Sequence, residues 1–371
     1  MWSQWAEDQL AAIRRADRWR SLVAFDALGA AGSLRGRDVI AFSSNDYLGL
    51  SQHPAVRAAA RDAIERFGTG ATASRLIVGT RSLHIELEAA LAQSKQMERA
   101  LVFPNGFAAN LGVLSVMGVA DATIFSDELN HASLIDGSRL AKAKVVIYRH
   151  CDLEHLAELM RVTPGRKIVA TDAVFSMDGD VAPLQGLARL CREHDALLVL
   201  DEAHSVLGPD PDVNACELIR VGTLSKTLGS LGGWAAGPRP LIELLINRAR
   251  SFIFTTGLTP ADAAAALAAL RICDSDEGDT LRTRLRGLID TLVAGHPSPV
   301  IPIVLGEDRA ALEAAEYLLR QGIYVPAIRP PTVPAGTARL RIALSAVHTP
   351  AMVQELKGAL DTLRSNGTAG D

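Results

Sequence analysis

The sequence predicts an α/β fold: a large domain built on a mostly parallel, doubly wound sheet, with a smaller α+β domain after it. The first observation is an alternation from about residue 99, where short apolar, β-branched runs are separated by stretches of helix length. Strands that alternate with helices form right-handed crossover units. The second is a change of texture after residue 257. The third is the length of 371 residues, which suits two or three domains.

The elements follow in chain order. Residues 1–24 are expected to form one helix, with a rough apolar stripe and a solvated arginine-rich face. The expected strands of the large domain are residues 101–103, 122–125, 145–148, 168–171, 197–200, 219–221 and 234–236. The helices expected between them are residues 105–117, 131–142, 153–162 and 184–194.

The C-terminal part is expected to begin with helix over residues 261–298 and to end with helix 351–363. Between these lie expected strands at 300–305, 323–328 and 339–344, and residues 366–371 are expected to fray. The predicted organisation is an N-terminal helix and arm (1–40), a large domain (41–260) and a C-terminal domain (261–371).

Composition excludes several classes of function. The formal net charge is -4 and aromatic residues make up only 5% of the chain, which argues against a nucleic-acid-binding face. No apolar run reaches the roughly 18 residues of a membrane span, and the acidic, amphipathic start is not a secretory signal. The four cysteines are far apart and form no CxxC pair, which argues against a zinc site and for a reduced, cytoplasmic setting.

Three residues, Asp201, His204 and Lys226, give the strongest indication of a chemical function. Lys226 lies in a loop of small residues, 222–229, about two dozen residues after an apolar run that ends in Asp201 and is followed by His204. Alone, each residue has an ordinary explanation: a turn aspartate, a core histidine and a solvated lysine. Together they provide an amine for an aldehyde and a carboxylate for a protonated pyridine nitrogen, so the sequence predicts pyridoxal 5′-phosphate as the cofactor.

A phosphate site is expected where residues 105–107 open a helix, because backbone N–H groups at a helix start bind anions. Thr223 would face it, although for this segment taken alone an ordinary Asn-Gly turn between strand and helix is the better explanation. His131 follows another apolar run and could stack on a pyridine ring, or be a helix-start histidine without a role. The GxGxxA-like segment 67–73 follows no clear strand, so we interpret it as a flexible loop near the site and not as a dinucleotide motif.

These segments, taken together, closely resemble the α-oxoamine synthases, a fold-type-I pyridoxal phosphate family. The matching stretches are residues 42–50, 74–76, 104–110, 130–134, 174–180, 201–204 and 222–229. The resemblance runs from about residue 40 to 350, and residues 329–341 resemble the biotin-pathway members. It implies decarboxylative condensation of L-alanine with pimeloyl-CoA or a pimeloyl carrier protein, in a homodimer.

The resemblance also implies roles for single residues. Lys226 would hold the cofactor and remove the α-proton, Asp201 would pair with the pyridine nitrogen, and His131 would stack on the ring. The other implied cofactor contacts are Gly106, Phe107 and Thr223 at the phosphate, Ser176 and His204 at the ring oxygen, and Thr256 across the dimer interface. The implied substrate contacts are Asn45 and Arg341 at the amino-acid carboxylate, and Thr332 with Arg20 (or Arg18) of the first helix at the acyl substrate.

Two departures from the family pattern leave the acyl entrance and the acyl donor open. Ser205 stands where the family commonly has glycine, and residues 208–216 are shorter than the usual Gly/Arg-rich loop. Three alternatives remain: a sibling synthase that uses glycine or serine, an aminotransferase on the same fold, and a binding or regulatory protein without turnover. The joint presence of Lys226, Asp201, His131 and Arg341 argues against the last.

Overall fold

The computed structural model describes residues 1–208, 210–212 and 214–365. It forms two compact units, a larger one of Leu48–Ser176 with Asp180–Arg282, and a smaller one of Met1–Tyr47, Met177–Gly179 and Thr283–Asp371. These units differ from the expected segments at both ends of the chain. Residues 261–282 belong to the larger unit, and the strands between residues 25 and 41 share a sheet with Ile323–Tyr324.

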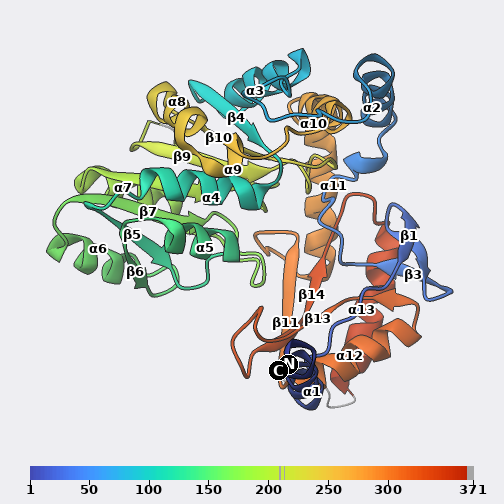
Figure 1. Cartoon of the computed structure of the whole chain (residues 1–371). Coiled ribbons are helices and arrows are strands. Elements are labelled where there is room, and N and C mark those ends of the chain that lie inside the picture. Colours follow the sequence, from blue (N-terminus) through green and yellow to red (C-terminus); the bar gives the residue numbers. More distant parts are fainter. Residues whose placement is uncertain (209, 213, 366–371) are drawn as a thin grey trace. The chain divides into compact units, whose positions relative to one another are not determined.

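The larger unit is built on a seven-stranded sheet (Figure 1). In order across the sheet, its strands are β4 (Arg99–Phe103), β10 (Gly233–Gly237), β9 (Leu218–Thr223), β8 (Ala196–Asp201), β7 (Arg166–Asp172), β5 (Ala122–Asp127) and β6 (Lys144–Tyr148). Strands β9, β8, β7, β5 and β6 run parallel, and β10 is antiparallel to both of its neighbours. The predicted mostly parallel sheet is therefore confirmed.

Both faces of this sheet are covered by helices, which explains the uninterrupted apolar runs of its strands. One face packs against α4 (Gly106–Met117), α5 (Ala132–Leu140), α8 (Arg239–Arg248) and α9 (Arg250–Ile253). The other packs against α6 (Leu153–Val162) and α7 (Leu184–Glu193). In β8, Leu197 and Val199 enter the first core, while Leu198 and Leu200 enter the second. This alternation is the period of two expected of a strand.

The rest of the larger unit is helical: η1 (Leu50–Gln52), α2 (Pro54–Phe67), α3 (Ser82–Ser94), α10 (Pro260–Cys273) and the start of α11 (Asp276–Leu292). The helical segment expected over residues 261–298 is present as two helices, which end at Leu292, and the chain breaks between them at Asp274 and Ser275. The Ser275 hydroxyl donates to the Ile272 carbonyl, and three acidic residues open α11, which suits the positive end of a new helix.

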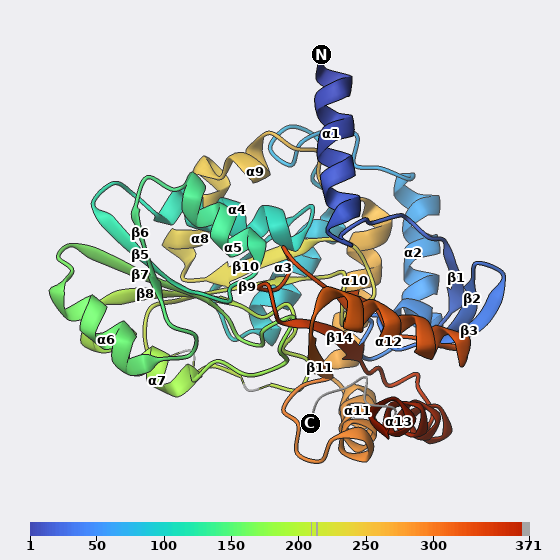
Figure 2. The ribbon, with the colours of Figure 1, turned by 90° about the horizontal axis from the view of Figure 1, so that it is seen from below.

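The smaller unit has two sheets. The first contains β1 (Phe25–Leu28), β2 (Ala31–Leu34), β3 (Arg37–Ala41) and β12 (Ile323–Tyr324), and Figure 2 shows β1 to β3 side by side. The second contains β11 (Val300–Gly306), β14 (Ala338–Ala343) and β13 (Ala327–Ile328). The strand expected over 323–328 is split between the two sheets at Pro326, which has no N–H to donate. The unit's helices are α1 (Trp2–Arg15), α12 (Asp308–Arg320) and α13 (Pro350–Ser365).

The expected N-terminal helix is shorter than the sequence suggested. Helix α1 ends at Arg15, and Asp17 takes a left-handed backbone conformation with φ of 53°, which aspartate tolerates better than most residues. Arg18 and Arg20 therefore lie beyond the helix and not on its face. The tail expected to fray, residues 366–371, lies outside the described residues. Among the helices that are described, none combines the length and apolar character that a membrane crossing requires.

Candidate active site

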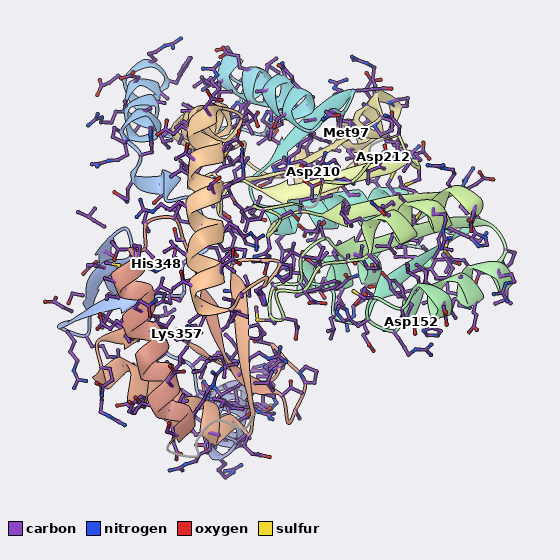
Figure 3. The ribbon with its side chains drawn as sticks, turned by 180° about the vertical axis from the view of Figure 1, so that it is seen from behind. Met97, Asp152, Asp210, Asp212, His348 and Lys357 are labelled. Carbon is purple, nitrogen blue, oxygen red and sulfur yellow. The ribbon has the colours of Figure 1, made fainter. Side chains whose placement is uncertain are left out.

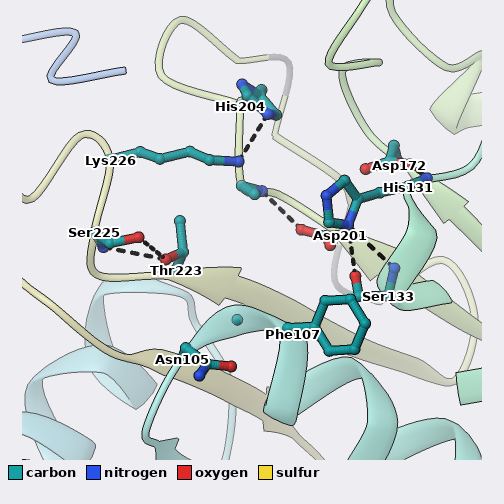
Figure 4. A pocket seen from close by; sticks show the side chains of 12 residues that line it. Asn105, Phe107, His131, Ser133, Asp172, Asp201, His204, Thr223, Ser225 and Lys226 are labelled. Carbon is teal, nitrogen blue, oxygen red and sulfur yellow. Dashed lines mark hydrogen bonds between the residues drawn. The ribbon is translucent and has the colours of Figure 1, made fainter. Parts of the chain in front are cut away.

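A pocket of about 210 Å³ opens in the larger unit beyond the carboxyl ends of β7, β8 and β9 (Figure 4). This is where parallel α/β sheets place their ligands. Its lining residues are Asn105, Gly106, Phe107, His131, Ser133, Asp172, Asp201, Ala203, His204, Thr223, Ser225 and Lys226. Seven of the nine cofactor contacts implied by the sequence thus line one pocket.

Lys226 and His204 meet inside this pocket. The Lys226 Nζ lies 2.7 Å from the His204 Nε2, and Figure 4 shows the extended lysine directed at the imidazole. Lys226 comes from the loop after β9, and buried His204 from the turn after β8. Two neighbouring strand ends therefore bring a nucleophilic amine and an imidazole into contact, an arrangement in which one group can control the proton of the other.

Asp201, the last residue of β8, is held by donors on its own unit. The Asn110 Nδ2 donates to its Oδ2 over 2.6 Å, and the backbone N–H of Ala203 donates to its Oδ1 over 2.9 Å. Asn110 also donates to the Ser133 hydroxyl. Hydrogen bonds to the ionised form stabilise a carboxylate, so the site presents a fixed anion that a protonated ring nitrogen can pair with.

Asp172 ends β7 and pairs in register with Asp201. Burial, together with the nearby charge of Asp201, raises the pKa of Asp172 well above its usual value. Its Oδ2 accepts the backbone N–H of His131 over 2.7 Å. Sequence reasoning assigned no role to Asp172 or Asn110. Two features of the sequence could have indicated them: Asp172 ends the strand next to β8, and Asn110 is a polar residue on the otherwise apolar face of α4.

His131 caps the start of α5. Burial is the main cause that lowers the pKa of His131, and Lys226 acts in the same direction. Its Nδ1 accepts the Ser133 backbone N–H over 3.2 Å and lies 2.7 Å from the Ser133 hydroxyl. In the neutral ring this places the proton on Nε2. A neutral, oriented imidazole is suited to stack on another ring.

The start of α4 and the hydroxyls of Thr223 and Ser225 form another part of the pocket. Asn105 caps the helix by accepting the Ala108 N–H over 2.7 Å, and the Thr223 and Ser225 hydroxyl oxygens are 2.7 Å apart. A Cβ added to Gly106 would lie 3.3 Å from the Thr223 Cβ. A residue without a side chain therefore keeps space between the helix start and these hydroxyls, as an anion cradle requires.

The implied substrate residues belong to the smaller unit. Asn45 Oδ1 accepts from Arg341 Nη2 over 3.3 Å and from the Tyr47 hydroxyl over 3.1 Å. Burial raises the pKa of Tyr47 to about 12, so it acts as a donor at neutral pH. Arg20 donates to the Pro330 carbonyl over 3.1 Å, two residues before Thr332.

Two of the implied cofactor contacts, Ser176 and Thr256, do not line the pocket, and neither do Ser205 and Asp127. Ser176 is the last residue of the first segment of the larger unit, and Thr256 pairs with Ser74 in an isolated bridge. Asp127 ends β5 at the same edge of the sheet, but its carboxylate binds His150 and the backbone N–H of Cys151. Ser205 lines a neighbouring cavity, and among the described residues its hydroxyl oxygen has no hydrogen-bond partner.

The His150 cluster is explained by charge pairing. His150 lies 2.9 Å from Asp127 and 2.6 Å from Asp180, and Cys151 is near enough that these side chains could surround a cation. Burial would lower the pKa of His150, but the hydrogen bonds to Asp127 and Asp180 raise it to about 12. The protonated imidazole itself therefore supplies the positive charge between the two carboxylates.

The comparisons with known proteins agree with this geometry. The family model described as "Aminotransferase class I and II" matches residues 37–360. The chain is 48% identical to the 8-amino-7-oxononanoate synthase of Anaeromyxobacter dehalogenans, covering 90% of this chain and 88% of that protein. It is 46% identical to that of Methylobacterium nodulans, with coverages of 98% and 97%. A serine palmitoyltransferase from S. paucimobilis, solved with a bound PLP–myriocin aldimine, superposes with a TM-score of 0.91 at 29% identity, covering 98% and 97%.

The chain belongs to the aminotransferase class I and II family, and its fold is that of the fold-type-I pyridoxal phosphate transferases. Within that family it groups with the 8-amino-7-oxononanoate synthases, which are PLP-dependent acyltransferases. The predicted cofactor and the resemblance to the α-oxoamine synthases are thereby confirmed. The pocket fits pyridoxal 5′-phosphate, because it combines an anion cradle, an amine and a fixed carboxylate in one space.

Proposed function

We propose that this enzyme condenses L-alanine with a pimeloyl thioester to give 8-amino-7-oxononanoate, CO₂ and the free thiol carrier. A carbon–carbon bond forms between the alanine Cα and the thioester carbonyl, the carbon–sulfur bond breaks, and the alanine carboxyl group leaves as CO₂. The observation that carries this is the Lys226–His204 contact of 2.7 Å beside the fixed Asp201 carboxylate. The names of the relatives, at 46–48% identity, support the biotin-pathway assignment.

The bound cofactor supplies an electron sink for the negative charge that develops at the amino-acid Cα. Lys226 would hold the cofactor and then take the Cα proton, with His204 orienting its Nζ. Asp201 would keep the ring nitrogen protonated, because a carboxylate held by Asn110 favours a cationic partner. Neutral His131 would stack on the ring and exclude water from it.

The remaining contacts are proposals of the same kind. Gly106, Phe107, Thr223 and, from the second subunit of a homodimer, Thr256 would hold the phosphate, and Ser176 with His204 would contact the ring oxygen. Arg341 and Asn45 would hold the amino-acid carboxylate, a role for which a buried guanidinium suits a planar anion. Thr332 and Arg20, from the smaller unit, would contact the acyl chain. We also propose that the enzyme works in the cytoplasm.

The test is CO₂ release from purified holoenzyme against a panel of single amino acids and acyl thioesters. The proposal expects release with L-alanine and pimeloyl-CoA or a pimeloyl carrier protein, and these two donors are assayed separately. Release with glycine alone, or with serine and a long-chain acyl thioester, would replace it with a sibling synthase. Amino-group exchange with an oxo acid and no CO₂ would make the protein an aminotransferase.

A further inference from the structure

A buried ion network lies next to the pocket, on the far side of the turn that follows β8. Asp201 lines the pocket, whereas Glu202, the next residue, lines a separate cavity of about 620 Å³. The Glu202 side chain is 3% exposed. It forms a hydrogen-bonded ion pair with the Arg220 Nε, and its other oxygen lies 3.0 Å from the Lys95 Nζ.

Arg220 is the centre of this network. It is on β9, paired in register with Leu200 of β8, and its side chain is also 3% exposed. Beyond Glu202, its Nη1 donates to the Lys95 carbonyl over 2.9 Å and its Nη2 pairs with Asp210 over 3.0 Å. Figure 3 labels Asp210, which is largely exposed. One guanidinium thus joins the end of β8, the end of α3 and the loop after His204.

The position of Arg220 would be unfavourable for a lone charge. Burial alone would lower the pKa of Arg220, but Glu202 and Asp210 raise it on balance. A buried guanidinium and a buried carboxylate that satisfy each other hold a fixed geometry, because any movement leaves a charge without a partner. The fixed Arg220–Glu202 pair therefore restrains the backbone on either side of Glu202.

Glu202 is part of the turn after β8, between the pocket residues Asp201 and His204. Its backbone N–H donates to the Val221 carbonyl over 2.7 Å, and its carbonyl accepts the Ser205 N–H over 3.0 Å. Asp201 precedes Glu202, and His204, which contacts Lys226, follows two residues later. Fixing the Glu202 side chain therefore limits movement of both Asp201 and His204.

We infer that Arg220, acting through Glu202, is a positioning residue for the reaction: it holds the turn so that His204 stays within hydrogen-bond distance of Lys226. This inference rests on the proposed roles of Lys226 and His204. It predicts that loss of the contact shifts the protonation of the lysine nitrogen as well as the rate, whereas a loss of stability alone would change neither property of the folded enzyme.

The experiment compares Arg220→Met and Glu202→Gln with the wild type, and with Arg220→Lys, which keeps the charge but loses the planar fork. The control is Arg192→Met. Arg192 donates from α7 to the Ala215 carbonyl and so anchors the far end of the same loop without touching Glu202. Each folded holoenzyme is measured for kcat and KM, for the pH midpoint of the bound cofactor's absorbance, and for thermal unfolding.

The expected result is that Arg220→Met and Glu202→Gln each lower kcat by roughly tenfold or more, since small displacements at a reacting centre have large effects. Both should shift the absorbance midpoint, with KM for the amino acid nearly unchanged. Arg220→Lys should fold, with a kcat and a midpoint between those of these two variants and the wild type. A double variant that combines Arg220→Met with Glu202→Gln should have a kcat no lower than that of the slower single variant. Arg192→Met should match the wild type in rate and midpoint.

An unchanged midpoint and kcat in Glu202→Gln and Arg220→Lys, whatever their stability, would overturn the inference. So would an equal effect of Arg192→Met, because loop anchoring in general would then be responsible. The absorbance titration needs no substrate, so it still decides the inference if the enzyme does not condense alanine with a pimeloyl thioester. Failure of the proposed function and failure of this inference are thereby distinguished.

Discussion

Asp172 and Asp201 end neighbouring parallel strands in register, and both carboxyl groups line the pocket beside Lys226. Only Asp201 is held by side-chain and backbone donors suited to an anion. Burial, followed by the nearby charge of Asp201, raises the pKa of Asp172 well above its usual value. The environment therefore favours the neutral form of Asp172 over a second negative charge beside Asp201.

Asp172→Asn is expected to keep most of the condensation activity, because the raised pKa of Asp172 favours a neutral carboxyl group, and the amide that replaces it is neutral and still accepts the His131 N–H. Its stability is expected to rise at neutral pH. A carboxyl group whose pKa is raised on folding weakens the fold as pH rises above its unfolded value, and asparagine removes that effect. The measurement is kcat/KM and thermal unfolding, with Asp201→Asn as the reference. Equal loss of activity in the two variants would contradict this account.

The Asn110–Asp201 hydrogen bond leads to a second expectation. Asn110→Leu removes the donor to Asp201 over 2.6 Å and the donor to the Ser133 hydroxyl. A hydrogen bond to a charged group contributes about 1.5–3 kcal/mol, so we expect kcat/KM to fall by at least roughly tenfold. Asn247→Leu, at an exposed asparagine that donates to Glu243 on α8, is the matched control. Wild-type rates in Asn110→Leu would show that Asp201 needs no such support.

A substitution at Gly106 tests whether the start of α4 and the Thr223 hydroxyl bind the cofactor phosphate. A Cβ there would lie 3.3 Å from the Thr223 Cβ, so Gly106→Ala is expected to weaken cofactor affinity, measured as the Kd for pyridoxal phosphate from absorbance or fluorescence. Gly358 on α13 has no atom within 4 Å of an added Cβ, so Gly358→Ala should leave that Kd unchanged and stabilise the fold by about 0.4–1 kcal/mol. Unaltered affinity in Gly106→Ala would place the phosphate elsewhere.

His84 gives a pH dependence of stability. It is fully buried; its Nδ1 accepts the Arg81 N–H and its Nε2 donates to the Leu258 carbonyl. Burial, followed by the charge of Arg75, lowers the pKa of His84 to about 4. The unfolded state therefore binds the proton first as pH falls, and stability is lost between about pH 6.5 and 4, by roughly 1 kcal/mol per pH unit.

The check is chemical unfolding of holoenzyme at fixed protein and cofactor concentration across that range. His84→Gln, which keeps a donor for Leu258, should show a shallower decline than the wild type. Parallel pH profiles for the two proteins would show that His84 is not responsible.

The sequence predicted the strand ends of the site because the signal was local. Apolar runs at residues 197–200 and 219–221 marked β8 and β9, and Asp201, His204 and Lys226 follow them within five residues. Asn110 and Asp172 were missed, because their importance comes from contacts that no motif encodes: one across from α4 to β8, the other between adjacent strands. Their chemistry becomes visible only once the sheet order is known.

The predicted ends of helices and strands were wrong where the backbone conformation of a single residue ended the element. Asp17 in a left-handed conformation ended α1 nine residues early, which took Arg18 and Arg20 off the helix. Pro326 divided one expected strand between two sheets. The hairpin strands β1 to β3 were not expected at all, since each is only four or five residues long, too short to show a clear hydrophobic period.

The central claim is that the nitrogen of Lys226 carries the cofactor. The most direct measurement is borohydride reduction of the holoenzyme, proteolysis and mass spectrometry of the peptides, with Lys226→Ala treated in parallel. A phosphopyridoxyl mass is expected on the peptide containing Lys226, and none in the variant. A label on any other lysine, or an unlabelled wild-type protein, would contradict it.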